Sequence, residues 1–169
     1  MAKIATTRIL YATPRAPTAL PWVWPLPRLD GIAPSIVATH ADGVELGYAG
    51  RVAAAGLVPV FAARDGIVTY AARAGASPTV WLDHADGWSS QYAELEHVLA
   101  APVDRFRRRR KPRVRAGDII GHARRSTLGV RFALSRLIEG EPGAADAAAL
   151  MAGWSLLPWF DEPAGREAA

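Results

Sequence analysis

Histidines are the side chains of this sequence best suited to hold a metal ion or to move a proton near neutral pH, because the chain contains no cysteine. There are four of them, at positions His40, His84, His97 and His122. The spacing between His97 and His122 fits no zinc signature, and a single histidine is more often a hydrogen-bonded scaffold residue than a ligand. One set of three ligands is still conceivable, namely His40, Glu45 and His122, and it would give a hydrolase with unorthodox ligands.

Five short sequence motifs follow one another between residues 41 and 134. They are ADGVELGY (41–48), PVFAARDGIVTYAA (59–72), TVWLDHADGWSSQYAEL (79–95), PRVRAGDIIGHA (112–123) and LGVRFAL (128–134). In this order they resemble the lysostaphin/LytM-type (M23) peptidoglycan endopeptidases, whose pattern runs from HxGxD through HxdGxxtxYxHL and VxxGxxIG to HLHFE. The resemblance implies a mainly β fold, an antiparallel β-sheet of the LytM/lysostaphin (duplicated-hybrid-motif-like) type, which in active members carries a zinc-dependent peptidase site.

The metal-binding and catalytic positions of that pattern carry other residues in this chain. Carried over position by position, the five family residues fall on Ala41, Glu45, Glu94, Gly129 and Arg131. Alanine and glycine have no side-chain lone pair and arginine is a permanent cation, whereas a catalytic zinc needs about three protein ligands. The resemblance therefore implies a degenerate site with no metal, no other cofactor and no catalytic residue.

Arg131 could replace the charge of the missing metal. Residues two apart in a strand share a face, so positions 129 and 131 should both point into the family's groove. If Glu45 and Glu94 point there too, the guanidinium would lie within hydrogen-bond reach of a carboxylate. The alternative is that these three charges are solvated separately on the sheet surface. The expected neighbours of the groove are His40, Tyr92 and His122.

A dense run of cations leads into the fourth motif and ends within it. It holds eight of the chain's 20 Lys and Arg residues, and the formal net charge is +4. Such density predicts an anionic partner, either nucleic acid, lipid headgroups or an anionic wall polymer; the alternative is a solvated loop. The residues of this basic loop are Arg105, Arg107, Arg108, Arg109, Arg110, Lys111, Arg113 and, at its end, Arg115.

Short strands must position these residues. Val, Ile, Tyr and Trp are concentrated in segments bounded by Gly, Asp and Pro, which is typical of antiparallel sheets. We expect a strand at 4–12 and a proline-rich arm within residues 1–34, the LytM-like β domain over 35–140, and a C-terminal helix and tail over 141–169. Within the domain we expect strands at 58–63, 66–73, 79–84, 88–95, 112–115, 118–123 and 129–137, and a helical turn at 95–101. The run AADAAALMA (144–152) predicts a helix of about nine residues that ends before Gly153.

Length and composition favour one globular domain, since the chain has 169 residues, of which 50% are hydrophobic and 21% charged. No segment resembles a transmembrane span of ~20 apolar residues, and the N-terminus lacks the pattern of a secretory signal. We therefore expect cytoplasmic synthesis. A role at the cell wall would require release by lysis or delivery in a virion or injection particle.

Three functions are compatible with these features. The favoured one is a non-catalytic M23 peptidase-like domain, a pseudoenzyme that binds peptidoglycan, a cell-wall hydrolase or neighbouring subunits of a phage-related assembly. The second is an active peptidoglycan metalloendopeptidase with atypical ligands. The third is a polyanion or nucleic-acid binder that uses the basic loop. Metal content separates the first two, and salt dependence of binding identifies the third.

Overall fold

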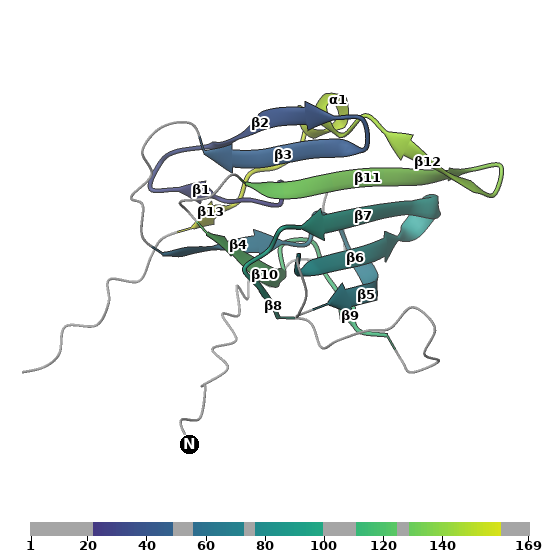
Figure 1. The fold of residues 1–169 in the computed structure, drawn as a ribbon, viewed down its shortest axis with the longest axis horizontal. Helices are drawn as coiled ribbons and strands as arrows, with labels where there is room; N and C mark the ends of the chain where they lie inside the picture. The colour runs from purple at the N-terminus through teal and green to yellow at the C-terminus, as the bar shows by residue number, and fades with distance from the viewer. Residues whose placement is uncertain (1–21, 49–55, 73–76, 100–110, 125–128, 160–169) are drawn as a thin grey trace, which may run out of the picture.

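Antiparallel β-structure makes up most of the described chain. The computed structural model describes residues 22–48, 56–72, 77–99, 111–124 and 129–159 (Figure 1). Its largest sheet has eight strands in the order β2, β3, β11, β7, β6, β5, β9, and β12 pairs with β11 off this path. These strands are β2 (Pro34–His40), β3 (Gly43–Tyr48), β5 (Gly66–Ala72), β6 (Thr79–His84), β7 (Trp88–Ala93), β9 (Arg113–Val114), β11 (Val130–Ile138) and β12 (Glu141–Ala145).

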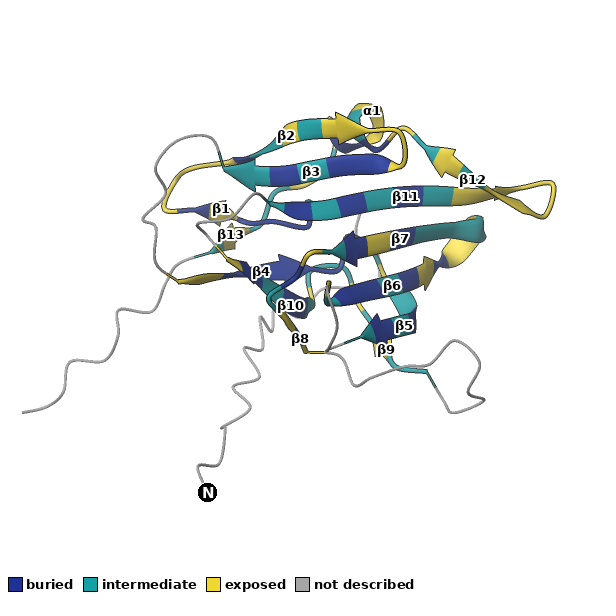
Figure 2. Cartoon of the chain, in the orientation of Figure 1, coloured by how far each residue is buried: buried dark blue, intermediate teal, exposed yellow. Residues whose placement is uncertain are grey.

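A second, three-stranded sheet completes the hydrophobic core. Its order is β4 (Leu57–Phe61), β10 (Ile119–Arg124), β8 (His97–Val98). Val60 and Ile120 of this sheet belong to the same buried cluster as Leu82 and Phe132 of the large sheet (Figure 2). Burial of such side chains is the main favourable term in folding, so the two sheets stabilise each other.

Burial alternates along the central strand of the large sheet. In β11, Val130, Phe132 and Leu134 are buried, whereas Arg131 and the two alternate residues that follow it are half-buried. Successive side chains of a strand point to opposite faces, so Arg131 lies on the side away from the core. We call this side the outer face. Its members on β3, β7 and β11 are Glu45, Ser89, Gln91, Ala93, Arg131, Ala133 and Ser135.

Tryptophans anchor the described part of the proline-rich arm. The ring of Trp22 stacks on Trp154 at a centroid distance of 4.8 Å and meets His84 edge-on at 5.2 Å. The Arg64 guanidinium lies 5.2 Å from the Trp22 ring centroid, within the range of a cation–π contact. Further along, β1 (Arg28–Leu29) pairs in parallel with β13 (Pro158–Trp159). The described parts of the arm and of the C-terminal tail therefore pack against each other.

Three local predictions were wrong or incomplete. The C-terminal helix α1 covers only Ala147–Met151, because residues 141–145 pair with the end of β11 as β12. Cross-strand hydrogen bonds here override the helix propensity of alanine. The predicted helical turn at 95–101 contains the short strand β8, and the hairpin formed by β2 and β3 was not predicted. The strand predicted at 4–12 lies outside the described residues.

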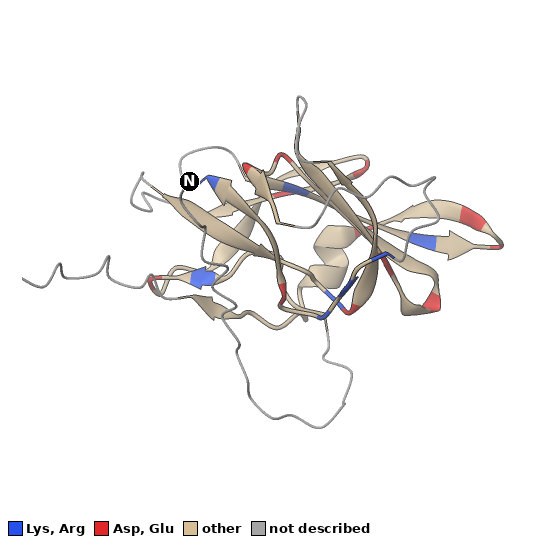
Figure 3. Cartoon of the chain, turned by 90° about the horizontal axis from the view of Figure 1, so that it is seen from below, with Lys and Arg blue, Asp and Glu red and all other residues tan. Residues whose placement is uncertain are grey.

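The β11–β12 hairpin projects beyond the rest of the large sheet (Figure 1). Ile138 pairs with Glu141, so its turn is the two residues Glu139 and Gly140. Both have positive φ angles, 53° and 87°, which is the type I′ geometry that matches strand twist. Leu137 and Ile138 beside the turn are 55% and 61% exposed, and acidic residues mark the hairpin tip in Figure 3. The projection thus ends in an apolar pair flanked by negative charge.

Candidate functional site

Strand pairing brings the substituted family positions to neighbouring places on the large sheet. Arg131 pairs with Glu45 of β3 on one side and with Ala93 of β7 on the other. Glu94 follows Ala93 directly and has a φ of 62°. Gly129 directly precedes β11, and Ala41 lies in the two-residue turn between β2 and β3. The five positions thus follow β3 and β11, from Gly129 beside Gly47 near one end of β3 to Ala41 in the turn before its other end.

The ion pair of Arg131 differs from the predicted one. Its guanidinium Nη2 lies 2.7 Å from Oδ1 of Asp42, whereas the expected partner was Glu45 or Glu94. This hydrogen bond raises the pKa of Arg131 and lowers that of Asp42, and the charges of Glu94 and Glu45 also raise the Arg131 pKa. The two acids are therefore near enough to act through their field, but Asp42 makes the contact.

Exposure limits what this ion pair contributes to stability. The side chains of Arg131 and Asp42 are 40% and 72% exposed, and exposed pairs gain little because water screens them. The pair is therefore a surface feature and not the buried replacement of a metal ion. In the sequence, the only signal for an Arg131–Asp42 contact is that Asp42 directly precedes Gly43, as turn residues often do.

His40 lies beside the retained carboxylate of the site. Its Nε2 atom is 3.6 Å from Oε2 of Glu45, and the Glu45 side chain is only 16% exposed. A pocket of about 270 Å³ adjoins these residues. Its lining consists of Thr39, His40, Ala41, Gly43, Val44, Ala144, Ala145, Asp146 and Ala147.

The residues at the family's zinc positions do not fit a zinc ion. Of these, Ala41 offers no donor atom, Glu45 offers one carboxylate, and Arg131 places a permanent cation where a dication would bind. Gly129, at a catalytic position of the family, offers no side-chain donor either. A Cβ atom added to Gly129 would overlap the carbonyl oxygen of Leu46 on β3. No side chain, histidine included, can therefore occupy position 129 while β3 and β11 keep their present spacing.

Two expected groove neighbours lie elsewhere. Tyr92 is fully buried in the core, where its hydroxyl accepts a hydrogen bond from the Ala63 amide at 2.8 Å; alternation along β7 turns it away from Arg131. His122 is on β10 of the smaller sheet, paired with His97, so it does not join His40 and Glu45. Within the five described segments, no three His, Cys, Asp or Glu residues are grouped closely enough to hold a metal ion.

Polar and aromatic groups cover the outer face next to Arg131. The hydroxyls of Ser89 and Ser135 are hydrogen-bonded at 2.6 Å, and Gln91 is exposed between the Ser89 and Ala93 positions. Trp81 of β6 contacts Tyr70 of β5, with ring centroids 5.3 Å apart. This part of the outer face therefore combines hydrogen-bonding groups with aromatic rings.

Five of the eight residues of the basic loop lie outside the described residues, which resume at Lys111. Lys111 is half-buried, and Arg113 is exposed on β9 at an edge of the large sheet. In the part of the chain that the structure describes, no helix is long and apolar enough to cross a membrane.

Comparisons with known proteins identify the fold. The model of peptidase family M23 matches residues 41–134. A chain of the SpoIIQ–SpoIIIAH pore-forming complex has a TM-score of 0.50 at 15% identity, with 82% of this chain and 100% of that chain covered. The lytM glycyl-glycine endopeptidase from Ruminococcus gnavus ATCC 29149 has a TM-score of 0.51 at 15% identity, with 76% and 58% covered. No curated protein matches the chain. The predicted LytM-type antiparallel fold is confirmed.

Proposed function

The chain belongs to peptidase family M23, and we propose that it is a non-catalytic member that acts as a binding or assembly module. The observation that carries this proposal is Arg131, which stands at a metal-ligand position and donates a hydrogen bond to Asp42. A cation held at that position opposes the binding of a dication. The family's hydrolysis requires a metal to activate water, so we expect neither zinc at this site nor zinc-dependent cleavage.

Peptidoglycan is the ligand that we propose for the outer face. The supporting features are the exposed amide of Gln91, the hydroxyls of Ser89 and Ser135, and the Tyr70–Trp81 pair. Such groups recognise sugars and peptides because they combine hydrogen bonds with an apolar platform. Contact with the wall would follow lysis or delivery in a virion or injection particle.

The test is a sedimentation assay with purified peptidoglycan. We expect the chain to co-sediment with it, to leave its turbidity unchanged, and to contain far less than one zinc per chain by elemental analysis. Gln91→Glu adds a negative charge on the outer face and should weaken binding to this anionic polymer. Ala149→Glu adds the same charge on helix α1 and serves as the matched control. Zinc-dependent clearing of the peptidoglycan would refute the loss of catalysis.

A protein partner is the second candidate, and the β11–β12 hairpin favours it. Leu137 and Ile138 are the most exposed large hydrophobic residues of the described chain, and exposed apolar side chains at a projecting tip suit an interface. The SpoIIQ–SpoIIIAH pore-forming complex shows that a chain of this fold class occurs in an assembly. Replacing both residues with serine should abolish self-association in light scattering if the partner is a second copy. Unchanged self-association of the double serine variant would show that the hairpin is not the interface between copies.

A further inference from the structure

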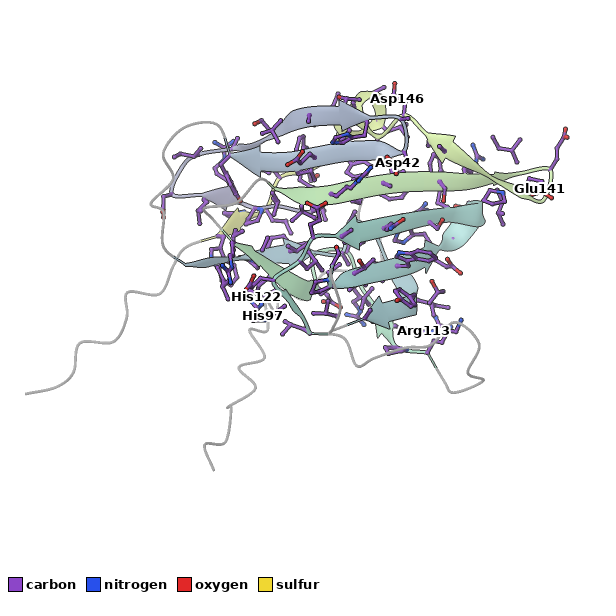
Figure 4. The ribbon with its side chains drawn as sticks, in the orientation of Figure 1. Asp42, His97, Arg113, His122, Glu141 and Asp146 are labelled. Atoms are coloured by element: carbon purple, nitrogen blue, oxygen red, sulfur yellow. The ribbon has the colours of Figure 1, made fainter. Side chains whose placement is uncertain are left out.

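We propose that His97 and His122 form a two-histidine site for a divalent transition-metal ion such as Zn²⁺ or Cu²⁺. The two residues are 25 positions apart in the sequence, yet they are direct partners in the pairing of β8 with β10. Figure 4 shows them side by side, well away from Asp42. The site is separate from the substituted family positions, which lie on the large sheet.

The pairing of β8 with β10 places the two imidazoles close enough to bind the same ion. Directly opposed residues of an antiparallel pair lie on the same face, with Cβ atoms about 4.5–5.5 Å apart. A zinc–nitrogen bond is about 2.0–2.1 Å long, so one ring nitrogen from each side chain can reach the same ion by rotation about its side-chain torsions. Both neighbours of His122, Gly121 and Ala123, are buried, which places the His122 ring on the side of β10 away from the core.

Interactions around the pair hold the two strands in this register. The Glu96 amide donates to the His122 carbonyl at 2.8 Å, and the Leu99 amide donates to the Ile120 carbonyl at 3.0 Å. Arg124 donates to both carboxylate oxygens of Glu96, at 2.6 and 2.7 Å. A chelating pair on a fixed scaffold loses less conformational entropy when it binds an ion. Because Glu96 is occupied by Arg124, the two histidines are the ligands of the site.

Both rings are available to an ion. His97 is exposed and His122 is half-buried, and neither ring has a hydrogen-bond partner among the residues that the structure describes. An imidazole binds a metal ion through the lone pair of a neutral ring nitrogen, so binding should weaken at acidic pH.

Two histidines leave the coordination of the ion incomplete. Zinc takes four ligands in most protein sites, so water or a group from another molecule must supply the rest. The site should therefore be weak and exchangeable in comparison with a structural zinc site. Imidazole suits both zinc and copper, and copper should bind more tightly.

The test uses the full chain and its four histidines, which are few enough to follow individually by NMR. Titration calorimetry with Zn²⁺ should find one ion per chain, and Cu²⁺ should broaden the imidazole signals of His97 and His122. His97→Gln and His122→Gln should each weaken Zn²⁺ binding by roughly tenfold or more, the scale on which site mutations reduce metal affinity. His40→Gln is the matched control and should bind as the wild type does.

A measurement of thermal stability shows whether a variant has lost the metal site or has lost its fold. Each must unfold at the wild-type temperature by circular dichroism, because His97 and His122 are not in the core. Loss of Zn²⁺ binding in His40→Gln, or unchanged binding in both other variants, would overturn the proposal. Absence of Zn²⁺ and Cu²⁺ binding by the wild type would overturn it as well, and it would leave the proposed role of the outer face untouched.

Discussion

Removal of the Tyr92 hydroxyl should destabilise the chain, although it alters one atom. Tyr92 is 0% exposed and accepts a hydrogen bond from the Ala63 amide at 2.8 Å. Its hydroxyl also lies 3.0 Å from the Ser90 hydroxyl, which in turn lies 2.7 Å from Nε2 of His84. In Tyr92→Phe the Ser90 hydroxyl keeps its bond to His84, whereas the Ala63 amide loses its partner.

The size of the effect follows from the burial of that amide. Ala63 is 0% exposed, so water cannot replace the lost hydroxyl. A buried donor without a partner costs about 1–3 kcal/mol, and we expect a loss near ~2 kcal/mol in the free energy of unfolding. For a chain of this size that corresponds to a fall of roughly 4–8 °C in the melting temperature.

The assay is urea denaturation followed by tryptophan fluorescence. Tyr70→Phe is the matched control, because Tyr70 is only half-buried, and we expect it to change the midpoint little. Tyr92→Phe should lower the midpoint at an unchanged slope. A Tyr92→Phe variant as stable as Tyr70→Phe would show that the hydroxyl does not satisfy the Ala63 amide.

Other consequences of the structure can be tested in the same way. Burial raises the pKa of Tyr92 to about 12 from 10.0, so its contribution of roughly 2–3 kcal/mol is present below pH 10 and lost between pH 10 and 12; Tyr92→Phe should flatten this part of a stability–pH profile. Burial lowers the pKa of His84, so stability should fall as the pH drops below 6.5, less steeply in His84→Gln. Arg131→Ala should leave the urea midpoint almost unchanged because its bond to Asp42 is exposed; a large loss would contradict this description. If the basic loop binds a polyanion, replacing residues 107–110 with serine should reduce the salt dependence of affinity in titrations at low and high salt.

The sheet could be predicted because its signals are local. Alternating Val, Ile and aromatic residues with Asp-Gly turns specify short strands, and five motifs in order specified how they are arranged. The nine-residue helix was wrong because pairing between β11 and β12 is a tertiary effect. Helix propensity at Ala144 and Ala145 carries no information about their cross-strand partners, Ser135 and Leu134 on β11.

The site was predicted as a set of positions but not as a set of contacts. Register places Glu45 and Arg131 side by side, but the contact of Arg131 with Asp42 depends on a turn conformation. The core position of Tyr92 could have been predicted, because side chains alternate between the two faces along Ser90, Gln91 and Tyr92 of β7. The pairing of His97 with His122 could not, because β8 and β10 meet only in the folded chain.

Gly129 bears on how a family histidine could be introduced at this position in evolution. A histidine at this position is blocked by the Leu46 carbonyl, so restoring the family's residues one at a time would meet a steric penalty at this step. The main chain of β3 or β11 would have to move first, through changes elsewhere that bring no catalytic benefit by themselves. Introduction of the histidine therefore depends on the order of mutations, and the close approach of the two strands favours retention of glycine at position 129.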